Sequence, residues 1–196
     1  MGRVREEMKK PLAILLLLFL FFCSCSKTEE TIAQKPVTKN EVYFSNLIEV
    51  ERQLYQKYSD EPYTGDVIDT TNVPKNEVRK GYVQIGYRTG KWLTKNKFNS
   101  IVSQERLYKD GILVEQRDYE NGLTRRHATF WDNGNDQKMQ IFNDKSEVEI
   151  EINYDENGEY HGWYQMITGD DSYYGIYKHG EIEYMYINDE PMIIKK

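Results

Sequence analysis

The chain has three histidines, His127, His161 and His179, and these are its best candidates for holding a metal ion. A zinc site needs three or four ligands that converge with a defined geometry. The histidines lie far apart in the sequence and show no ligand spacing, so we expect them on the surface or in turns. The sequence therefore predicts no metal site and no cofactor.

A second set of possible ligands is the carboxylates Glu147, Glu149 and Glu151, which together with Asp144 or Asp155 offer the oxygen atoms that calcium prefers. The three glutamates alternate with β-branched residues, which is typical of a strand. Alternate residues of a strand are about 7 Å apart, too far for one ion. We expect a solvated acidic face.

The chain contains no recognisable sequence motif for a catalytic nucleophile. There is no Gly-x-Ser-x-Gly sequence and no glycine-rich loop for phosphate, and both cysteines, Cys23 and Cys25, lie near the N-terminus. The sequence predicts that the protein is not an enzyme. A carbohydrate-active enzyme stays an alternative, because glycosidase carboxylates come from distant strands and leave no local spacing.

Charge excludes one class of partner. The formal net charge is −6, although the first ten residues carry Arg3, Arg5, Lys9 and Lys10. The rest of the chain is therefore more acidic still, and no basic face is visible. We expect no nucleic-acid partner and no attraction to anionic lipid through protein charge.

The N-terminus has the layout of an export signal. A basic segment precedes the apolar run Leu12–Phe22, which is shorter than the roughly 18 apolar residues of a membrane-spanning helix. Ser24 before Cys25 resembles the lipobox of bacterial lipoproteins, and this resemblance implies that Cys25 is diacylated and becomes the new N-terminus. An ordinary secretory peptide or short anchor is the alternative.

This layout predicts a signal peptide over 1–24 and a flexible, polar tether over 25–40. The implied location is the cell envelope, where the lipid at Cys25 anchors the protein to the periplasmic or surface side of a membrane. With Cys25 lipidated, the exported domain has no free thiol and no disulfide.

Residues 41–66 form an entry segment with two possible structures. Tyr43, Leu47, Val50, Leu54 and Tyr58 are spaced as on an amphipathic helix. The same residues also suit two short strands followed by a turn, which would make a hairpin. Composition alone favours the helix.

From residue 67 to residue 196 the sequence repeats. An aromatic residue followed three positions later by glycine occurs at Tyr87/Gly90, Tyr108/Gly111, Tyr119/Gly122, Trp131/Gly134 and Tyr177/Gly180. Imperfect copies lie at Phe98, Phe142, Tyr154/Gly158 and Met166/Gly169. The units end every 10 to 13 residues, which leaves strands of about 7 or 8 residues between tight turns.

Strands joined by tight turns are antiparallel neighbours. The sequence thus predicts an all-β domain, an elongated antiparallel meander of β-hairpin repeats that forms one twisted sheet. Aromatic residues at equivalent positions would lie side by side and stabilise the sheet by about 0.2–1 kcal/mol per pair. They also form a possible binding surface, since aromatic rings suit protein interfaces and stack on sugar rings.

The repeat resembles the MORN-repeat variant of bacterial proteins, in which Gly-Lys-Trp at 90–92 and Gly-Trp-Tyr at 162–164 match the strand openings. Many of those proteins are lipoproteins, some are labelled YwqK-type antitoxins, and a hairpin usually precedes their first repeat. The resemblance shifts our expectation for residues 47–67 from helix to strand. The signature residues it assigns are Tyr87, Gly90, Trp92, Tyr108, Gly111, Tyr119, Gly122, Trp131, Gly134, Gly158, Trp163, Gly169, Tyr177 and Gly180.

These features predict a membrane-anchored lipoprotein whose repeat domain is a non-catalytic binding or scaffolding surface for a protein or glycan partner. One alternative is an antitoxin or immunity-like protein that binds a toxin. The other is a carbohydrate-binding or carbohydrate-active protein, with Trp163 in the binding surface.

Overall fold

The computed structural model describes residues 41–192 of the 196-residue chain. The described residues all belong to one compact unit of the chain. The predicted signal peptide, the tether and Cys25 lie outside the described residues. Within 41–192 no helix has the length and apolar character needed to cross a membrane.

The described residues fold into strands joined by turns, with a single 3-10 turn, η1 (Phe44–Asn46). The strands are β1 (Glu41–Tyr43), β2 (Leu47–Val50), β3 (Gln53–Gln56), β4 (Gly65–Asp69), β5 (Glu77–Gln84), β6 (Tyr87–Asn96), β7 (Val102–Lys109), β8 (Ile112–Glu120), β9 (Leu123–Phe130), β10 (Asp136–Phe142), β11 (Val148–Tyr154), β12 (Tyr160–Thr168), β13 (Asp171–Lys178), β14 (Glu181–Ile187) and β15 (Glu190–Pro191).

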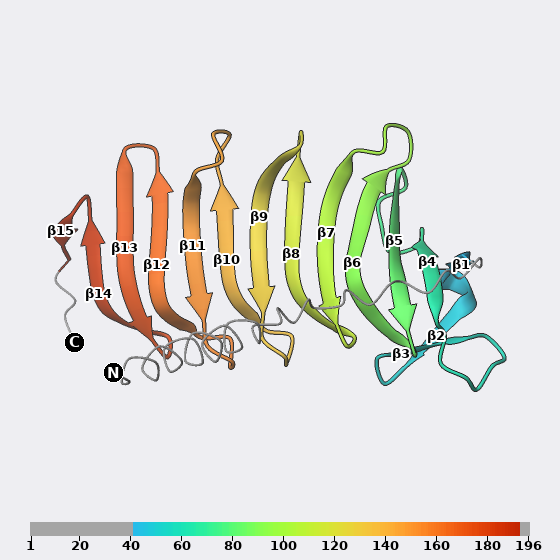
Figure 1. Ribbon diagram of the computed structural model, residues 1–196. Coiled ribbons are helices and arrows are strands. Elements are labelled where there is room, and N and C mark those ends of the chain that lie inside the picture. Colours follow the sequence, from blue (N-terminus) through green and yellow to red (C-terminus); the bar gives the residue numbers. More distant parts are fainter. Residues whose placement is uncertain (1–40, 193–196) are drawn as a thin grey trace, which may run out of the picture. The chain divides into compact units, whose positions relative to one another are not determined.

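Thirteen of these strands form one open sheet in the order β1-β4-β5 and then consecutively to β15 (Figure 1). From β4 onward every pair of neighbours is antiparallel, and only β1 pairs in parallel, with β4. The predicted all-β meander is therefore confirmed. Because consecutive strands point in opposite directions, every second turn lies at the same edge of the sheet.

The entry segment is a hairpin, and the helix that composition favoured is wrong. Strands β2 and β3 pair antiparallel through a turn at Glu51 and Arg52, whose φ angles are 50° and 70°. Of the five residues spaced for a helix, only two are buried, Leu47 and Leu54. The hairpin is favoured over the helix because it buries these two leucines against the long sheet and leaves the other three residues exposed.

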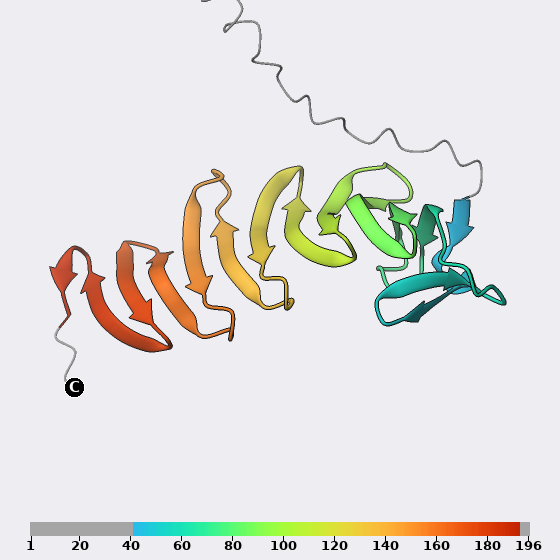
Figure 2. The same ribbon diagram turned by 60° about the horizontal axis from the view of Figure 1, so that its bottom comes forward.

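This hairpin lies over one face of the sheet at the β4–β6 end (Figure 2). It buries a core of Leu47, Leu54, Tyr63, Val67, Val83 and Trp92. Arg88 closes the core: its guanidinium lies 5.5 Å from the centre of the Phe44 ring and 5.9 Å from that of Trp92. It also donates two hydrogen bonds to Glu49, at 2.9 and 3.0 Å.

Most of the predicted turn glycines lie in turns. Gly111, Gly122, Gly134, Gly158, Gly169 and Gly180 all have φ between +63° and +90° between consecutive strands. Gly90 is the exception, and its predicted turn is wrong. It lies inside β6, where the pairing with β5 shifts register, and the turn before β6 is at Ile85 and Gly86. Gly90 adopts its φ of +63° in an irregularity of the strand.

Two rows of side chains on the covered face continue along the whole sheet, and their character changes from one end to the other. One row passes through Val67, Trp92, Gln116, Met139 and Met185, and each step follows from the strand register. This row is part of the core at β4–β6 and mainly polar at β7–β9. The second row is polar from β4 to β9, where it carries Asp69, Arg79, Thr94, Gln104, Asp118 and Arg126. At β10–β14 both rows are apolar. In the described part of the chain, no second layer lies over β7–β14 (Figure 2).

Candidate functional site

The apolar end of these rows is the first candidate surface. Its residues, which we call the apolar face, come from five consecutive strands, β10 to β14, and are all half-buried: Met139, Ile141, Ile150, Ile152, Tyr164, Met166, Tyr173, Met185 and Ile187. Single-layer sheets leave both faces open unless another element covers them. The apolar face is therefore a contiguous apolar surface in contact with solvent.

The opposite face of the same strands carries a shallow groove. Trp163, Ile176 and Tyr184 are direct cross-strand neighbours on β12, β13 and β14, and they are 45%, 39% and 59% exposed. With Tyr186 and the backbone of Gly175 they line a hollow of about 250 Å3. We call this the aromatic groove. The Trp163 ring also lies 5.8 Å from that of Tyr174, centre to centre.

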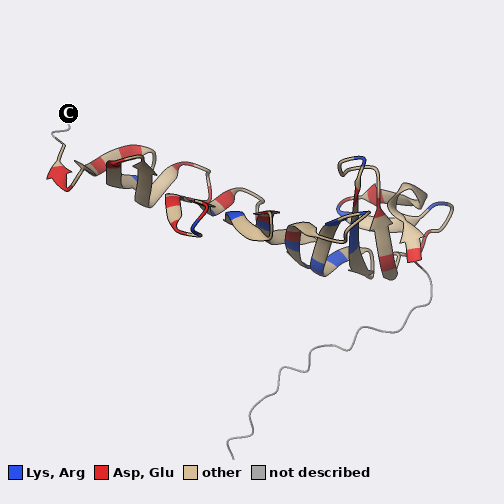
Figure 3. Cartoon of the chain, turned by 90° about the horizontal axis from the view of Figure 1, so that it is seen from above, with Lys and Arg blue, Asp and Glu red and all other residues tan. Residues whose placement is uncertain are grey.

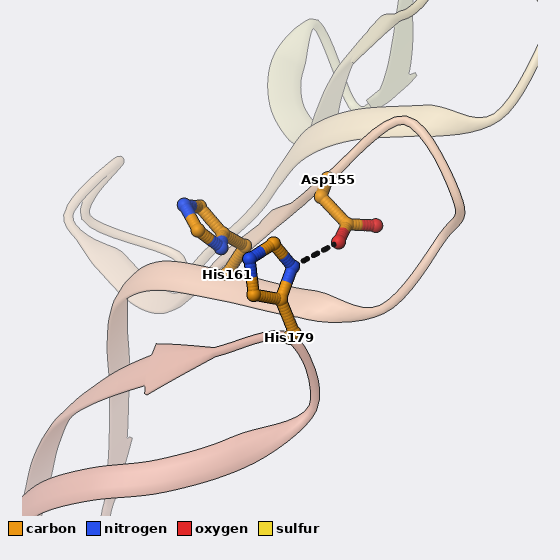
Figure 4. Close-up of side chains that lie close together, drawn as sticks. All are labelled: Asp155, His161 and His179. Atoms are coloured by element: carbon orange, nitrogen blue, oxygen red, sulfur yellow. Dashed lines mark hydrogen bonds and ion pairs between the residues drawn. The ribbon is translucent and has the colours of Figure 1, made fainter.

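A third candidate lies at one edge of the sheet, where three turns or strand ends meet. Asp155 follows β11, His161 is the second residue of β12, and His179 is in the turn between β13 and β14 (Figure 4). One ligand atom of each lies within 4.8 Å of the others. The rings of His161 and His179 are 5.0 Å apart, centre to centre.

Asp155 is held in place from two sides. Its Oδ1 accepts hydrogen bonds from the backbone N–H groups of Asn157, at 2.9 Å, and Glu159, at 3.1 Å. Its Oδ2 lies 3.0 Å from Nδ1 of His179. The hydrogen bond with His179, followed by those from the two backbone groups, lowers the pKa of the Asp155 carboxyl below its usual value. The side chain of Asp155 is only 13% exposed, whereas that of His179 is 61% exposed.

The sequence predicted no metal site because its histidines are far apart along the chain. The structure brings His161 and His179 together and leaves His127 elsewhere, on β9, where its Nε2 lies 2.9 Å from Glu115. The repeat could have predicted this contact. Two strands, β12 and β13, separate Asp155 from His179, and in a meander such residues lie at the same edge of the sheet.

Of the carboxylates considered for calcium, Asp144, Glu147 and Glu151 have protein partners. Partial burial alone would raise the pKa of Glu151, but hydrogen bonds from Lys138 and Gln140 outweigh it and lower the pKa. Glu147 accepts a hydrogen bond from Asn143, and Asp144 is ion-paired with Arg125. Glu151 therefore interacts with β10, Asp144 with β9, and Glu147 with its own turn.

The signature residues are spread over the sheet and do not form one site. Trp92 is 2% exposed in the core and its ring meets that of Tyr108 at 5.9 Å, centre to centre. Trp131 donates from Nε1 to the carbonyl of Tyr154, which joins the turn after β9 to the end of β11. Tyr87 and Tyr119 are half-buried on β6 and β8, whereas Tyr177 packs on β13 against Tyr160 and Tyr164. Of the signature residues, Trp163 lines the aromatic groove.

The two halves of the sheet differ in charge (Figure 3). Between Asp132 and Met192 there are 15 Asp and Glu against three Lys and no Arg. The apolar face, the aromatic groove and the histidine pair all lie in this acidic part. A cation or a basic partner is therefore attracted to it by the field of the whole segment.

Comparison with protein-family models and with curated proteins gives no match. Among solved structures, the chain is similar to the crystal structure of an S. aureus TarM mutant in complex with Fondaparinux, alpha-GlcNAc-glycerol and UDP. The identity is 16%, the TM-score is 0.34, and the match covers 53% of this chain and 19% of that one.

Proposed function

We propose that this chain is a lipid-anchored protein of the cell envelope whose repeat sheet is a non-catalytic binding or scaffolding surface. The observation that carries the proposal is the apolar face of β10–β14, which nothing in residues 41–192 covers. Soluble monomers rarely expose contiguous apolar surface of this kind, and where they do it marks an interaction site. An open sheet face also excludes little water, which suits binding better than catalysis.

The partner that fits this surface is a protein with an apolar patch and a basic rim. The apolar face supplies methionine, isoleucine and tyrosine side chains, which adapt to a partner and gain from being covered. The surrounding acidic segment, with 15 carboxylates against three lysines, favours a basic partner and accelerates its approach. An immunity role against a basic toxin is one case of this binding, and co-expression rescue tests it.

In-cell photo-crosslinking tests the binding surface. A photoreactive residue at Met166, on the apolar face, should give a discrete adduct with one partner. The matched control is Gln165, the preceding residue of β12, whose side chain points to the opposite face. Equal adducts from both positions, or none from Met166, would overturn the proposal.

Metabolic labelling with a palmitate analogue tests the anchor separately. Label should enter the wild-type protein and the Cys23→Ala variant and be lost in Cys25→Ala. Label that survives Cys25→Ala would remove lipidation at this residue. The binding result does not depend on this outcome, because the apolar face lies more than a hundred residues from Cys25.

The aromatic groove favours a second candidate function, carbohydrate binding. Trp163 and Tyr184 present exposed rings on either side of Ile176, an arrangement that stacks on the flat face of a sugar ring. A glycan array should give a signal that Trp163→Ala abolishes. Phe98→Ala, which removes an 88% exposed ring from the β6–β7 loop, should leave it unchanged. A signal that survives Trp163→Ala would reject the groove.

A further inference from the structure

We propose that Asp155, His161 and His179 form a binding site for a divalent transition-metal ion such as Zn2+. The three side chains come from the β11–β12 turn, the start of β12 and the β13–β14 turn (Figure 4). They place two imidazoles and one carboxylate with ligand atoms within 4.8 Å of one another. Two histidines and one carboxylate are an established ligand set for zinc and for other first-row metals.

The distance between two of the ligands already suits a metal. Oδ2 of Asp155 and Nδ1 of His179 are 3.0 Å apart. Two ligand atoms that each lie about 2.1 Å from one ion, at angles of about 90–110°, are separated by about 3.0–3.4 Å. The ion would therefore replace the proton that Asp155 and His179 share. Small rotations of Asp155 and His179 would direct their lone pairs at the ion, and the exposed side chain of His161 would turn toward the same point.

The surrounding turns position the site independently of any ion. The two backbone hydrogen bonds to Oδ1 hold the Asp155 carboxylate so that Oδ2 points toward His179. The backbone N–H of Gly180 donates to the carbonyl of Tyr160 at 2.9 Å, which fixes the β13–β14 turn beside the start of β12. Partners of this kind orient metal ligands and raise metal affinity.

The electrostatic setting also favours a cation. Glu156 and Glu159 belong to the same turn as Asp155, and Glu181 follows the turn that holds His179. The adjacent cation, Lys178, is the direct strand partner of Glu181. Because imidazole nitrogens prefer transition metals to calcium or magnesium, we expect the site to select Zn2+ over Ca2+.

A bound ion would add a direct link between strands that already meet through backbone hydrogen bonds and side-chain contacts. Asp155 and His179 are 24 residues apart, and the ion would join their turns across β12. Three protein ligands leave a coordination position for water or for a group of a bound partner. Binding to the folded state alone would stabilise the acidic end of the sheet.

Imidazole NMR signals of the full chain, in detergent and without a histidine tag, test the proposal. The chain should carry Cys23→Ser and Cys25→Ser, because free thiols also bind zinc. It then has three histidine side chains to assign. Addition of Zn2+ should shift the signals of His161 and His179 and saturate at one ion per chain, whereas His127 should not change. An equal concentration of Ca2+ should shift none of them.

Three variants separate binding from folding. His179→Asn tolerates the left-handed turn conformation, with φ of 48°, and Asp155→Asn keeps the Oδ1 acceptor of the turn, so both should fold. Each variant, like His161→Gln, should weaken Zn2+ binding by about tenfold or more. His127→Gln is the matched control and should leave it unchanged. Zinc shifts confined to His127, or affinity unchanged in all three variants, would overturn the proposal.

Discussion

Gly81 lies where the ring of Trp92 crosses the long sheet, and replacing it with alanine tests how tightly the core at β4–β6 is packed. A Cβ atom on Gly81 would lie less than 3.0 Å from Cδ2, Cε2 and Cγ of the Trp92 ring. No side chain can occupy that space without displacing the ring. The backbone of Gly81 does not require glycine for its conformation, since its φ is not positive. The test therefore isolates packing.

The expected cost follows from what holds the ring. The nearest ring atom, Cδ2, would lie 2.0 Å from the new Cβ, so Trp92 must retreat by about 1.5 Å to reach ordinary carbon–carbon contact of about 3.5 Å. The ring is 2% exposed and lies against Tyr108 and Arg88, so there is no free space to receive it. The shift would also weaken its hydrogen bond to the carbonyl of Tyr82. Overpacking and this bond together give a loss of about 2–4 kcal/mol in the free energy of unfolding.

Urea unfolding followed by circular dichroism measures this loss, and a double-mutant cycle identifies its cause. Trp92→Ala alone should lower the free energy of unfolding by about 3–5 kcal/mol. All variants are therefore compared in one fixed concentration of sucrose, which stabilises the folded state. In the Trp92→Ala background, Gly81→Ala should be neutral or stabilising, because its methyl group enters the space that the ring has left. A cost of about 2–4 kcal/mol in both backgrounds would refute the packing explanation.

Three further predictions concern the entry hairpin and one turn of the long sheet. Leu54→Ala, at a fully buried position of the hairpin, should cost about 2–5 kcal/mol by urea unfolding, whereas Ile48→Ala on the exposed side of the same hairpin should cost much less. Gly122→Ala should cost about 1–2 kcal/mol from its φ of +79° alone, because nothing lies within 4 Å of the new Cβ, and Gly122→Asn should recover part of it. The hydrogen bond from Arg88 lowers the pKa of Glu49 below its ordinary 4.5, so its contribution to stability is present above pH 4.5 and is lost as the pH falls through the folded-state pKa. The urea midpoint should therefore fall more steeply in acid for the wild type than for Arg88→Met.

Strand and turn positions between β7 and β14 are local properties, and the sequence predicted them well. Glycine at Gly111, Gly122 and Gly134 accepts the positive φ of a tight turn, and alternation along β11 marks a strand without reference to its neighbours. Gly90 misled the prediction because a glycine with positive φ also occurs in a strand irregularity. A turn and a strand irregularity differ in how the strands pair, and a local sequence pattern does not contain the strand pairing.

The entry segment shows the same limit. Leu47 and Leu54 are seven residues apart, a spacing that suits one face of a helix as well as two strands of a hairpin. The choice depended on what the leucines bury against, namely Val67, Val83 and Trp92 of the long sheet. That surface exists only after β4, β5 and β6 have paired.

The sequence alone determined that this protein is a ladder of short strands with turns about every eleven residues and an acidic C-terminal half. Tertiary structure decided which face is covered, which apolar side chains remain in solvent, and which polar groups meet. Asp155, His161 and His179 illustrate the physical reason: a meander returns to the same edge after two strands, so contact there depends on the register of three strands together. Register is a property of paired backbones, and spacing along one chain does not contain it.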